Sequence, residues 1–283
     1  MTLPFFNNVL AVMVLYQKRA EESETFLSLA KCLHGRPEKI DAVIYDNSPA
    51  PLWHDIEKQY DGLRIHYISD PSNPGVSKAY NAGFELARQS HKKWLLLLDQ
   101  DTVFPEGALA MYAVAIEKHA EPPLLAPMLV CDGKIYSPCR HVGNVNFPLH
   151  AIRPGMVPVK RLSLLNSGLC IRLDAFERVG GFNEMIPLDF ADHDFMRRYR
   201  EHFDSFALLN MVCVHGFSDK ESLDVGKALA RFRFYCLGAK NSIKGWTDAF
   251  SLFMVAFVRA QRLSTRFKDP RFFPLLFKTF FRN

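Results

Sequence analysis

The chain has 283 residues, a length that fits either one large α/β domain or two domains of about 150 residues each. Its composition, with 48% hydrophobic and 23% charged residues, excludes collagen-like, coiled-coil and disordered classes. The formal charge of +5 is concentrated in residues 255–283, which hold seven basic residues and one acid. The rest of the chain is close to neutral, so we expect no nucleic-acid partner.

Cysteine spacing and hydropathy indicate the cellular compartment in which the protein functions. The six cysteines form no C-x-x-C pair, which argues against a zinc site or a disulfide scaffold and predicts free core thiols in a reducing compartment. The apolar runs at 9–16 and 249–258 are too short to span a bilayer. We therefore expect a cytoplasmic protein, and the basic C-terminus leaves open an association with the inner face of the plasma membrane.

In the first half of the chain, stretches typical of strands alternate with stretches whose apolar residues have helical spacing. Continuously apolar, β-rich runs are separated by stretches with helical spacing, a pattern typical of βαβ units and a parallel sheet buried on both faces. This predicts an α/β fold of doubly wound type, with a mostly parallel sheet and helices on both faces. The predicted strands are 9–15, 40–45, 64–68, 94–98 and 206–214, and the predicted helices are 21–34, 52–60, 76–90 and 106–119.

Polar side chains follow three successive strands of this sheet. They are Asp46-Asn47-Ser48, the stretch from Asp70 to Gly75, and Asp99-Gln100-Asp101. Turn and N-cap chemistry explains any one of them. Together they predict a ligand crevice at the carboxyl ends of the strands. Carboxylates as close as Asp99 and Asp101 repel one another unless a cation lies between them, which favours a hard divalent ion, Mg²⁺ or Mn²⁺.

These motifs and those that follow resemble the inverting family-two glycosyltransferases of GT-A fold. The motifs from Asn166 onward are most similar to the rhamnosyltransferase-like branch, and the resemblance covers about residues 8 to 220. The segments that carry it, in chain order, are Asp46-Asn47-Ser48, Asn73 to Gly83, Leu98 to Asp101, Asn166-Ser167-Gly168, Gly180 to Glu184, and Leu188 to Arg198.

The resemblance implies a role for each matching residue. Asp99, Asp101 and His215 would form the metal site, and Asp192 would be the catalytic general base. Asp192 also suits a helix N-cap, and His215 also suits a structural histidine at a strand end. The other nine histidines have no comparable setting. The implied donor-binding residues are Asp46, Asn73, Gly75, Lys78, Asn81 and Asp99, although Lys78 stands where the family often has a small residue.

The function expected on this basis is metal-dependent inverting transfer of rhamnose or another hexose. The donor would be a dTDP- or UDP-sugar, and the acceptor a polysaccharide or lipid-linked glycan. The Q-x-x-R-W motif of processive synthases is absent, which favours one sugar per encounter. A non-catalytic nucleotide- or sugar-binding module is the alternative. A nucleotidyltransferase is less favoured because residues 16–20 lack its Gly-rich loop.

The expected organisation is a catalytic domain at 1–220 and a helical extension at 221–283. The domain would divide into a nucleotide-sugar half (1–120) and an acceptor half (121–220). In the basic, Phe-rich extension we expect a helix over 223–246 and a terminal helix with Phe273, Leu276, Phe277 and Phe280 on one face. That face would pack on the core or a second copy, or lie on an anionic membrane; both remain open.

Overall fold

The structure, a computed structural model, describes residues 4–53, 60, 62–216 and 224–281. In the first half the observed strands agree with the predicted ones to within a residue at each end. The helix expected over 52–60 falls mostly outside the described residues. The elements of this half are α1 (Pro4–Asn8), β1 (Val9–Leu15), η1 (Ala20–Glu22), α2 (Glu24–Leu33), β2 (Ile40–Asp46), β3 (Leu63–Ser69), α3 (Val76–Gln89), β4 (Trp94–Leu98) and α4 (Ala108–Lys118).

Helix α2 begins later than its periodicity predicts. Residues 20–22 form a separate 3₁₀ turn, and Ser23 then caps α2 by accepting a hydrogen bond from Phe26 N at 3.2 Å. Serine is a favoured N-cap because its hydroxyl satisfies a backbone N–H at the helix start. Hydrophobic spacing alone could not separate the turn from the helix.

Strands β1 to β4 form the expected parallel sheet, in the order β4-β1-β2-β3. Every residue of β1 and β4 is buried, which explains why both read as unbroken apolar runs. The register pairs Leu15 with Asp46 and Asp46 with Ser69, so these strands finish at one edge. The carboxyl-end motifs therefore lie along a common edge of the sheet.

The second half departs from a mostly parallel sheet. Strand β11 enters between β4 and β6 and is antiparallel to both, β6, β7 and β8 form an antiparallel meander, and β12 is parallel to β6. The α/β class is confirmed, but the run of adjacent parallel strands is limited to β1–β4, and in the second half only the β12–β6 pair of the described strands is parallel. The elements are β5 (Thr102–Val103), β6 (Leu124–Cys131), β7 (Lys134–Val142), β8 (Val145–Leu149), β9 (Gly155–Pro158), β10 (Leu162–Ser163), β11 (Cys170–Arg172), α5 (Leu173–Val179), α6 (Ala191–Tyr199) and β12 (Ser205–His215).

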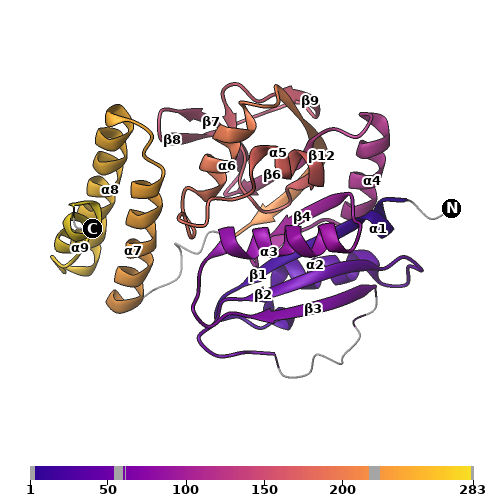
Figure 1. Cartoon of the computed structure of the whole chain (residues 1–283), viewed down its shortest axis with the longest axis horizontal. Helices are drawn as coiled ribbons and strands as arrows, with labels where there is room; N and C mark the ends of the chain where they lie inside the picture. Colours follow the sequence, from indigo (N-terminus) through magenta and orange to yellow (C-terminus); the bar gives the residue numbers. More distant parts are fainter. Residues whose placement is uncertain (1–3, 54–59, 61, 217–223, 282–283) are drawn as a thin grey trace.

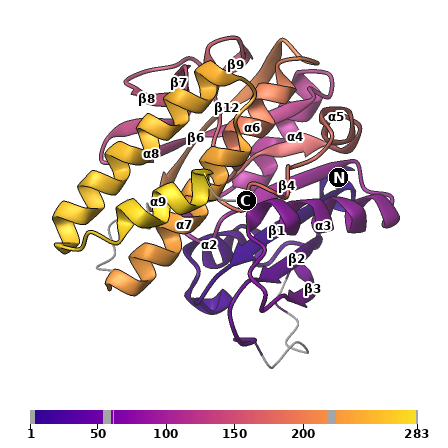
Figure 2. The same cartoon turned by 60° about the vertical axis from the view of Figure 1, so that its left-hand side comes forward.

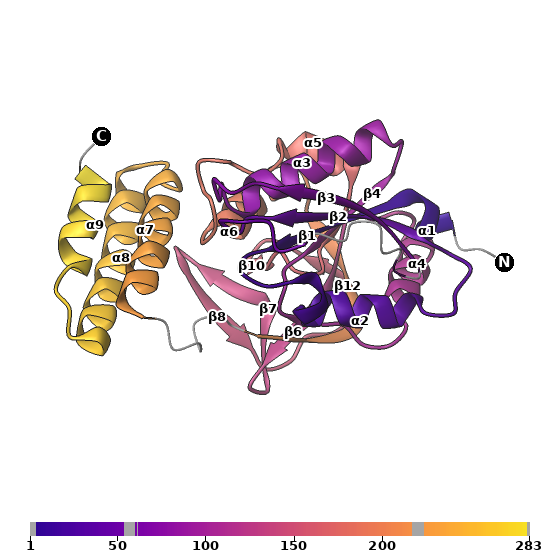
Figure 3. The ribbon, with the colours of Figure 1, turned by 90° about the horizontal axis from the view of Figure 1, so that it is seen from below.

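The core lies on both faces of this sheet. Alternate residues of β1 enter opposite clusters, with Val9 and Met13 on one side and Leu10 and Val12 on the other. Helices α2 and α4 cover the first side, and α3, α5 and α6 cover the second (Figure 3). Helix α3 approaches β1 closely through Gly83, where an added Cβ would lie 2.0 Å from Val12 Cγ2. All six cysteines are free and buried, as expected.

The C-terminal helices α7 (Val225–Asn241), α8 (Trp246–Phe267) and α9 (Phe272–Phe281) form a bundle beside the sheet (Figures 1 and 2). The bundle has its own apolar cluster, and α9 packs on α7 and α8 rather than on the sheet. Phe272 and Leu276 are its buried residues, whereas Phe277, expected on the packed face, is 46% exposed. No helix in the described part of the chain has the length and apolar character needed to cross a bilayer.

Candidate active site

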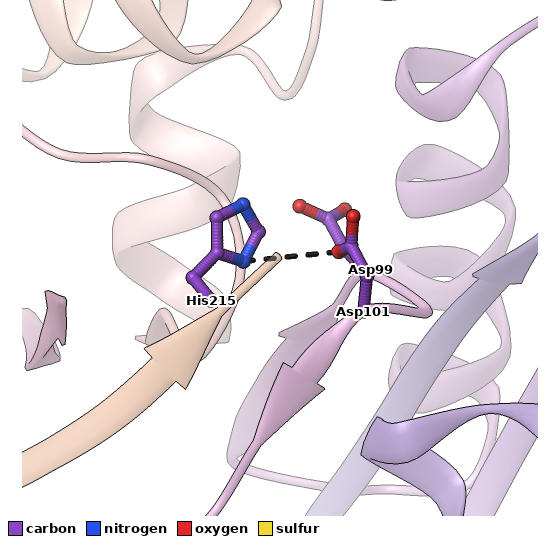
Figure 4. Close-up of side chains that lie close together, drawn as sticks. All are labelled: Asp99, Asp101 and His215. Carbon is purple, nitrogen blue, oxygen red and sulfur yellow. Dashed lines mark ion pairs between the residues drawn. The ribbon is translucent and has the colours of Figure 1, made fainter. Parts of the chain in front are cut away.

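Three potential metal ligands meet at the carboxyl end of the sheet. Asp99 and Asp101 follow β4, and His215 is the last residue of β12 (Figure 4). The antiparallel pairing of β12 with β5 sets His215 opposite Thr102, one residue beyond the Asp-x-Asp motif. Single ligand atoms of the three residues all lie within 4.8 Å of one another, and His215 Nδ1 is 3.7 Å from Asp101 Oδ1. The three predicted metal-site residues are thus brought together from distant parts of the chain.

A buried shell of hydroxyl groups orients this cluster. Thr102 Oγ1 lies 2.8 Å from both His215 Nδ1 and Ser167 Oγ. Ser167 Oγ in turn accepts a hydrogen bond from Asp99 N at 3.3 Å, and the Tyr80 hydroxyl donates to Asp99 Oδ1 at 2.7 Å. Such outer-shell partners fix the direction of metal ligands. Tyr80 and Thr102 were missed by the sequence reasoning, and Ser167 was noted only as part of a motif.

The electrostatics of the cluster suit a cation. Burial and the neighbouring Asp99 charge raise the pKa of Asp101 from 3.8 to about 7, because two close carboxylates resist double ionisation. Burial lowers the pKa of His215, which keeps its imidazole neutral and able to coordinate. A divalent ion would offset both the burial and the repulsion. Two carboxylates and one imidazole are a donor set that Mg²⁺ or Mn²⁺ accepts.

Asp192, on α6, lies close enough to the cluster to interact electrostatically with Asp99. It is the second residue of that helix, since the N-cap position is Phe190, so the N-cap alternative is wrong. Its side chain is 14% exposed, and its Oδ1 accepts a hydrogen bond from His193 N at 2.8 Å. Burial raises the pKa of Asp192 while His193 opposes the shift, and the charge of Asp99 raises it further. A raised carboxylate pKa brings a general base closer to the pH at which it works.

The neighbouring Asp194 has a different role. It is buried and forms ion pairs with Arg197 and with Arg198, the latter at 3.0 Å. Arg198 also donates to the backbone oxygens of Val179 and Gly181 at 2.7 Å. Asp194 therefore ties α6 to the preceding loop, which leaves Asp192 as the carboxylate of this Asp-x-Asp that is not held by an arginine ion pair.

A polar network next to Asp192 was not expected, because none of the nine other histidines was thought to have a setting comparable to that of His215. His193 Nε2 lies 3.6 Å from Asp192 Oδ1, and its Nδ1 is 2.9 Å from Ser163 Oγ. Asn146 bridges His193 to His141, whose ring stacks on that of His193 with centroids 5.4 Å apart. The network links the candidate base to the β7–β8 hairpin.

Two of the predicted donor-binding residues, Asp46 and Lys78, form hydrogen bonds or ion pairs with other residues of the chain. The buried Asp46 carboxylate accepts hydrogen bonds from Ser48 N at 2.8 Å, Leu52 N at 3.2 Å and the Tyr67 hydroxyl at 2.6 Å. Lys78 is exposed and pairs with Asp70 at 3.2 Å. These bonds organise the loops after β2 and β3. Direct contact of Asp46 and Lys78 with a donor stays a prediction.

The segment from Asn73 to Asn81 packs against the loop that precedes α6. Gly75 has a φ of +95°, and an added Cβ would lie 1.9 Å from Pro187 O. The same carbonyl accepts a hydrogen bond from Val76 N at 2.7 Å, so the start of α3 is occupied by the chain itself. Asn81 uses both ends of its amide on Phe182, through the backbone N and O at 2.9 Å. Gly75 and Asn81 thus have structural roles, and Asn73 adopts a left-handed φ of +48° in the turn before them.

Residues 11–122 are similar to a known family. This segment, which contains β1 to β4 and both candidate metal-site aspartates, matches the family described as glycosyl transferase family 2. The chain is also 21% identical to the dTDP-rhamnosyl transferase RfbF of Shigella flexneri over 218 residues, which cover 76% of the chain and 71% of the relative.

Solved structures show that the chain has a GT-A-like fold. S. aureus TarS 1–349 in complex with UDP-GlcNAc is similar with a TM-score of 0.54 and 15% identity, over 87% of this chain and 70% of that one. GalNAc-T7 with UDP, GalNAc and Mn²⁺ is similar with a TM-score of 0.57 and 9% identity, over 74% and 44% respectively. The chain spans 41% of a longer S. aureus TarS structure, which matches with a TM-score of 0.51. At these identities the likeness concerns the fold.

Proposed function

We propose that this glycosyltransferase moves one hexose from a nucleotide diphosphate sugar to a glycan or lipid-linked acceptor, with inversion and with the aid of Mg²⁺ or Mn²⁺. The observation that carries the proposal is the proximity of a candidate cation site to a mostly buried carboxylate. The Asp99–Asp101–His215 cluster offers the cation site, and the Asp192 side chain, which is 14% exposed, lies close enough to Asp99 for the Asp99 charge to raise its pKa. Inverting transfer needs these two functions together.

Each group has a distinct task in the proposed reaction. Asp99, Asp101 and His215 would hold the cation, which when bound neutralises charge that develops on the leaving diphosphate. Asp192 would take the proton of the acceptor hydroxyl as its oxygen attacks the anomeric carbon. Inversion follows from attack on the face opposite the leaving group. The Tyr80, Thr102 and Ser167 hydroxyls would keep the ligand atoms in place during the reaction.

The relatives support the chemical class of the donor. The Shigella flexneri relative is named as a dTDP-rhamnosyl transferase, and the TarS structure holds UDP-GlcNAc. We therefore propose a dTDP- or UDP-sugar as donor, with rhamnose as the favoured sugar. Asp46, Lys78 and Asn73 surround the nucleotide side of the crevice in this proposal, and Asp99 serves both donor and cation.

The proposal also assigns a role to each of two parts of the chain. Residues 1–220 would form the catalytic domain, with a nucleotide-sugar half before residue 120 and an acceptor half after it. Residues 221–283 would bring the domain to an anionic membrane at the inner face of the plasma membrane. Trp246 and Phe250 at the start of α8 are 84% and 69% exposed, and Phe281 at the end of α9 is 71% exposed. Exposed aromatics beside a basic segment suit an interfacial surface.

A binding panel followed by a turnover assay tests the function. Nucleotide sugars are screened for thermal stabilisation with and without Mn²⁺ or Mg²⁺, since a ligand at 100 times its dissociation constant adds about 2.7 kcal/mol. We expect at least one dTDP- or UDP-sugar to stabilise the protein only with the ion, and to release nucleoside diphosphate over time. Stabilisation without any release would favour the alternative, a non-catalytic nucleotide- or sugar-binding module.

A further inference from the structure

A small pocket between α7 and α8 gathers three arginine side chains. Arg231 reaches it from α7, and Arg259 and Arg266 from α8. The apolar side chains of Phe232, Leu263 and Phe267 line the rest. None of these residues belongs to the metal cluster or to the Asp192 network, so the pocket is separate from the candidate active site.

The charges around this pocket indicate the kind of ligand. Arg231 donates to Asp189 through both terminal guanidinium nitrogens, Nη1 at 2.6 Å and Nη2 at 3.1 Å. Arg259 lies over the ring of Tyr235 at 4.3 Å, and the exposed Arg266 over that of Phe267 at 5.3 Å. The Asp189 carboxylate offsets the charge of Arg231, and Arg259 and Arg266 add two further guanidinium charges at the same pocket, which an anion would offset.

Arginine also has the donor geometry for one class of anion. Its planar fork of N–H groups matches the paired oxygens of a phosphate, and such bonds are about twice as strong as bonds between neutral groups. The apolar half of the pocket suits a ligand whose phosphate is attached to an apolar group. We propose that Arg231, Arg259 and Arg266 form a phosphate-binding site. The phosphate would come from a lipid headgroup or from a soluble phosphate.

The site lies directly against the segment that leads to Asp192. Asp189, the partner of Arg231, is three residues before Asp192, and an added Cβ at Gly238 of α7 would lie 2.3 Å from Asp189 O. A phosphate held by Arg231 would therefore contact the bundle at the place where it joins the catalytic domain. The proposal does not depend on the sugar-transfer reaction, because it concerns binding alone.

The test measures phosphate binding to the full chain. Inorganic pyrophosphate is titrated by calorimetry in the presence of EDTA, so that no divalent ion bridges it to Asp99 and Asp101. Arg266→Gln is the test variant, because Arg266 is exposed and its loss spares the Arg231–Asp189 pair. Arg262→Gln is the matched control, since Arg262 is also an exposed arginine of α8 but does not line the pocket.

We expect saturable binding to the wild type, at least about tenfold weaker binding to Arg266→Gln, and unchanged binding to Arg262→Gln, because the variant loses one charge-assisted contact. Absence of saturable binding would overturn the proposal. Equal weakening by both substitutions would also overturn it, because that result describes a diffuse basic surface.

A second arm distinguishes the sources of the phosphate. Co-sedimentation is measured with phosphatidylcholine vesicles that contain phosphatidic acid. If Arg266→Gln lowers both pyrophosphate and vesicle binding relative to Arg262→Gln, the site binds a lipid headgroup. If only pyrophosphate binding falls, it binds a soluble phosphate. If vesicle binding falls equally in both variants while pyrophosphate binding is unaffected, the pocket is not a phosphate site.

Discussion

Replacing Asp101 with asparagine should stabilise the metal-free protein at alkaline pH. In the folded state the pKa of Asp101 is raised to about 7, whereas an unfolded chain has the ordinary value near 3.8. A raised folded pKa means that the folded state holds the proton more tightly. The stabilising contribution of the protonated form is complete below about pH 4 and is lost as pH rises through about 7.

The size of the effect follows from the same shift. Each unit of pKa difference corresponds to 1.36 kcal/mol, so full ionisation of Asp101 costs the metal-free fold about 4 kcal/mol at most. Its side chain is 27% exposed, and solvent screening reduces the cost. Asparagine carries no charge at any pH. Relative to the wild type, Asp101→Asn should therefore be more stable by about 2–4 kcal/mol at pH 8 and nearly equal at pH 4.

Denaturant unfolding in EDTA at pH 4, 6 and 8 measures this difference. Glu106→Gln is the control, because it removes one exposed carboxylate near β5 without touching the cluster. In the presence of Mn²⁺ the order should reverse, since the wild type gains binding energy that Asp101→Asn cannot gain. A stability difference that does not change with pH, or an Asp101→Asn variant that Mn²⁺ stabilises as much as the wild type, would refute this reasoning.

The remaining predictions concern four other positions. Asp192→Asn should keep donor binding and slow transfer by about two to four orders of magnitude, measured as product formation; a near wild-type rate would remove Asp192 as the base. Asp194→Asn should instead lower the free energy of unfolding by about 3–5 kcal/mol, because it leaves two arginines without their buried partner. Gly75→Ala should destabilise the protein far more than Gly107→Ala, because both glycines have positive φ but only at Gly75 would the new Cβ meet a carbonyl, 1.9 Å away; equal melting temperatures would contradict this. Trp246→Ser should weaken co-sedimentation with anionic vesicles without lowering the melting temperature. Unchanged binding would reject the exposed aromatic residues Trp246, Phe250 and Phe281 as a membrane contact.

The parallel half of the fold could be predicted because each strand and the turn after it are marked by residues within one short stretch of sequence. Strands β1, β2 and β4 are mostly apolar runs, and β3 alternates apolar with polar residues, so the strands and their carboxyl ends can be located from the sequence. Part of the antiparallel half could also have been predicted from the sequence. Asp132-Gly133, both with positive φ, joins β6 to β7 by a two-residue turn, which is a strong hairpin signal that we did not use.

The surroundings of the site could not be predicted in the same way. Tyr80 reaches Asp99 from the buried face of α3, and a buried tyrosine at helical spacing is indistinguishable from an ordinary core residue. His141 and Asn146 face each other across the β7–β8 hairpin, and only the packing of α6 on that sheet brings His193 to them. In α9, periodicity predicted an apolar face that includes the buried Leu276, but it did not show that Phe272 would be the second buried residue.

Donor turnover by the metal-loaded protein tests the central claim most directly. The protein is incubated with a dTDP- or UDP-sugar selected by the stabilisation screen, and the release of nucleoside diphosphate is followed with Mn²⁺ and with EDTA, for the wild type and Asp101→Asn. We predict release by the wild type that requires the ion, and release by Asp101→Asn that does not rise above the EDTA level. Release at the same rate with EDTA, or by Asp101→Asn at the wild-type rate, would contradict a metal-dependent glycosyltransferase built on the Asp99–Asp101–His215 cluster.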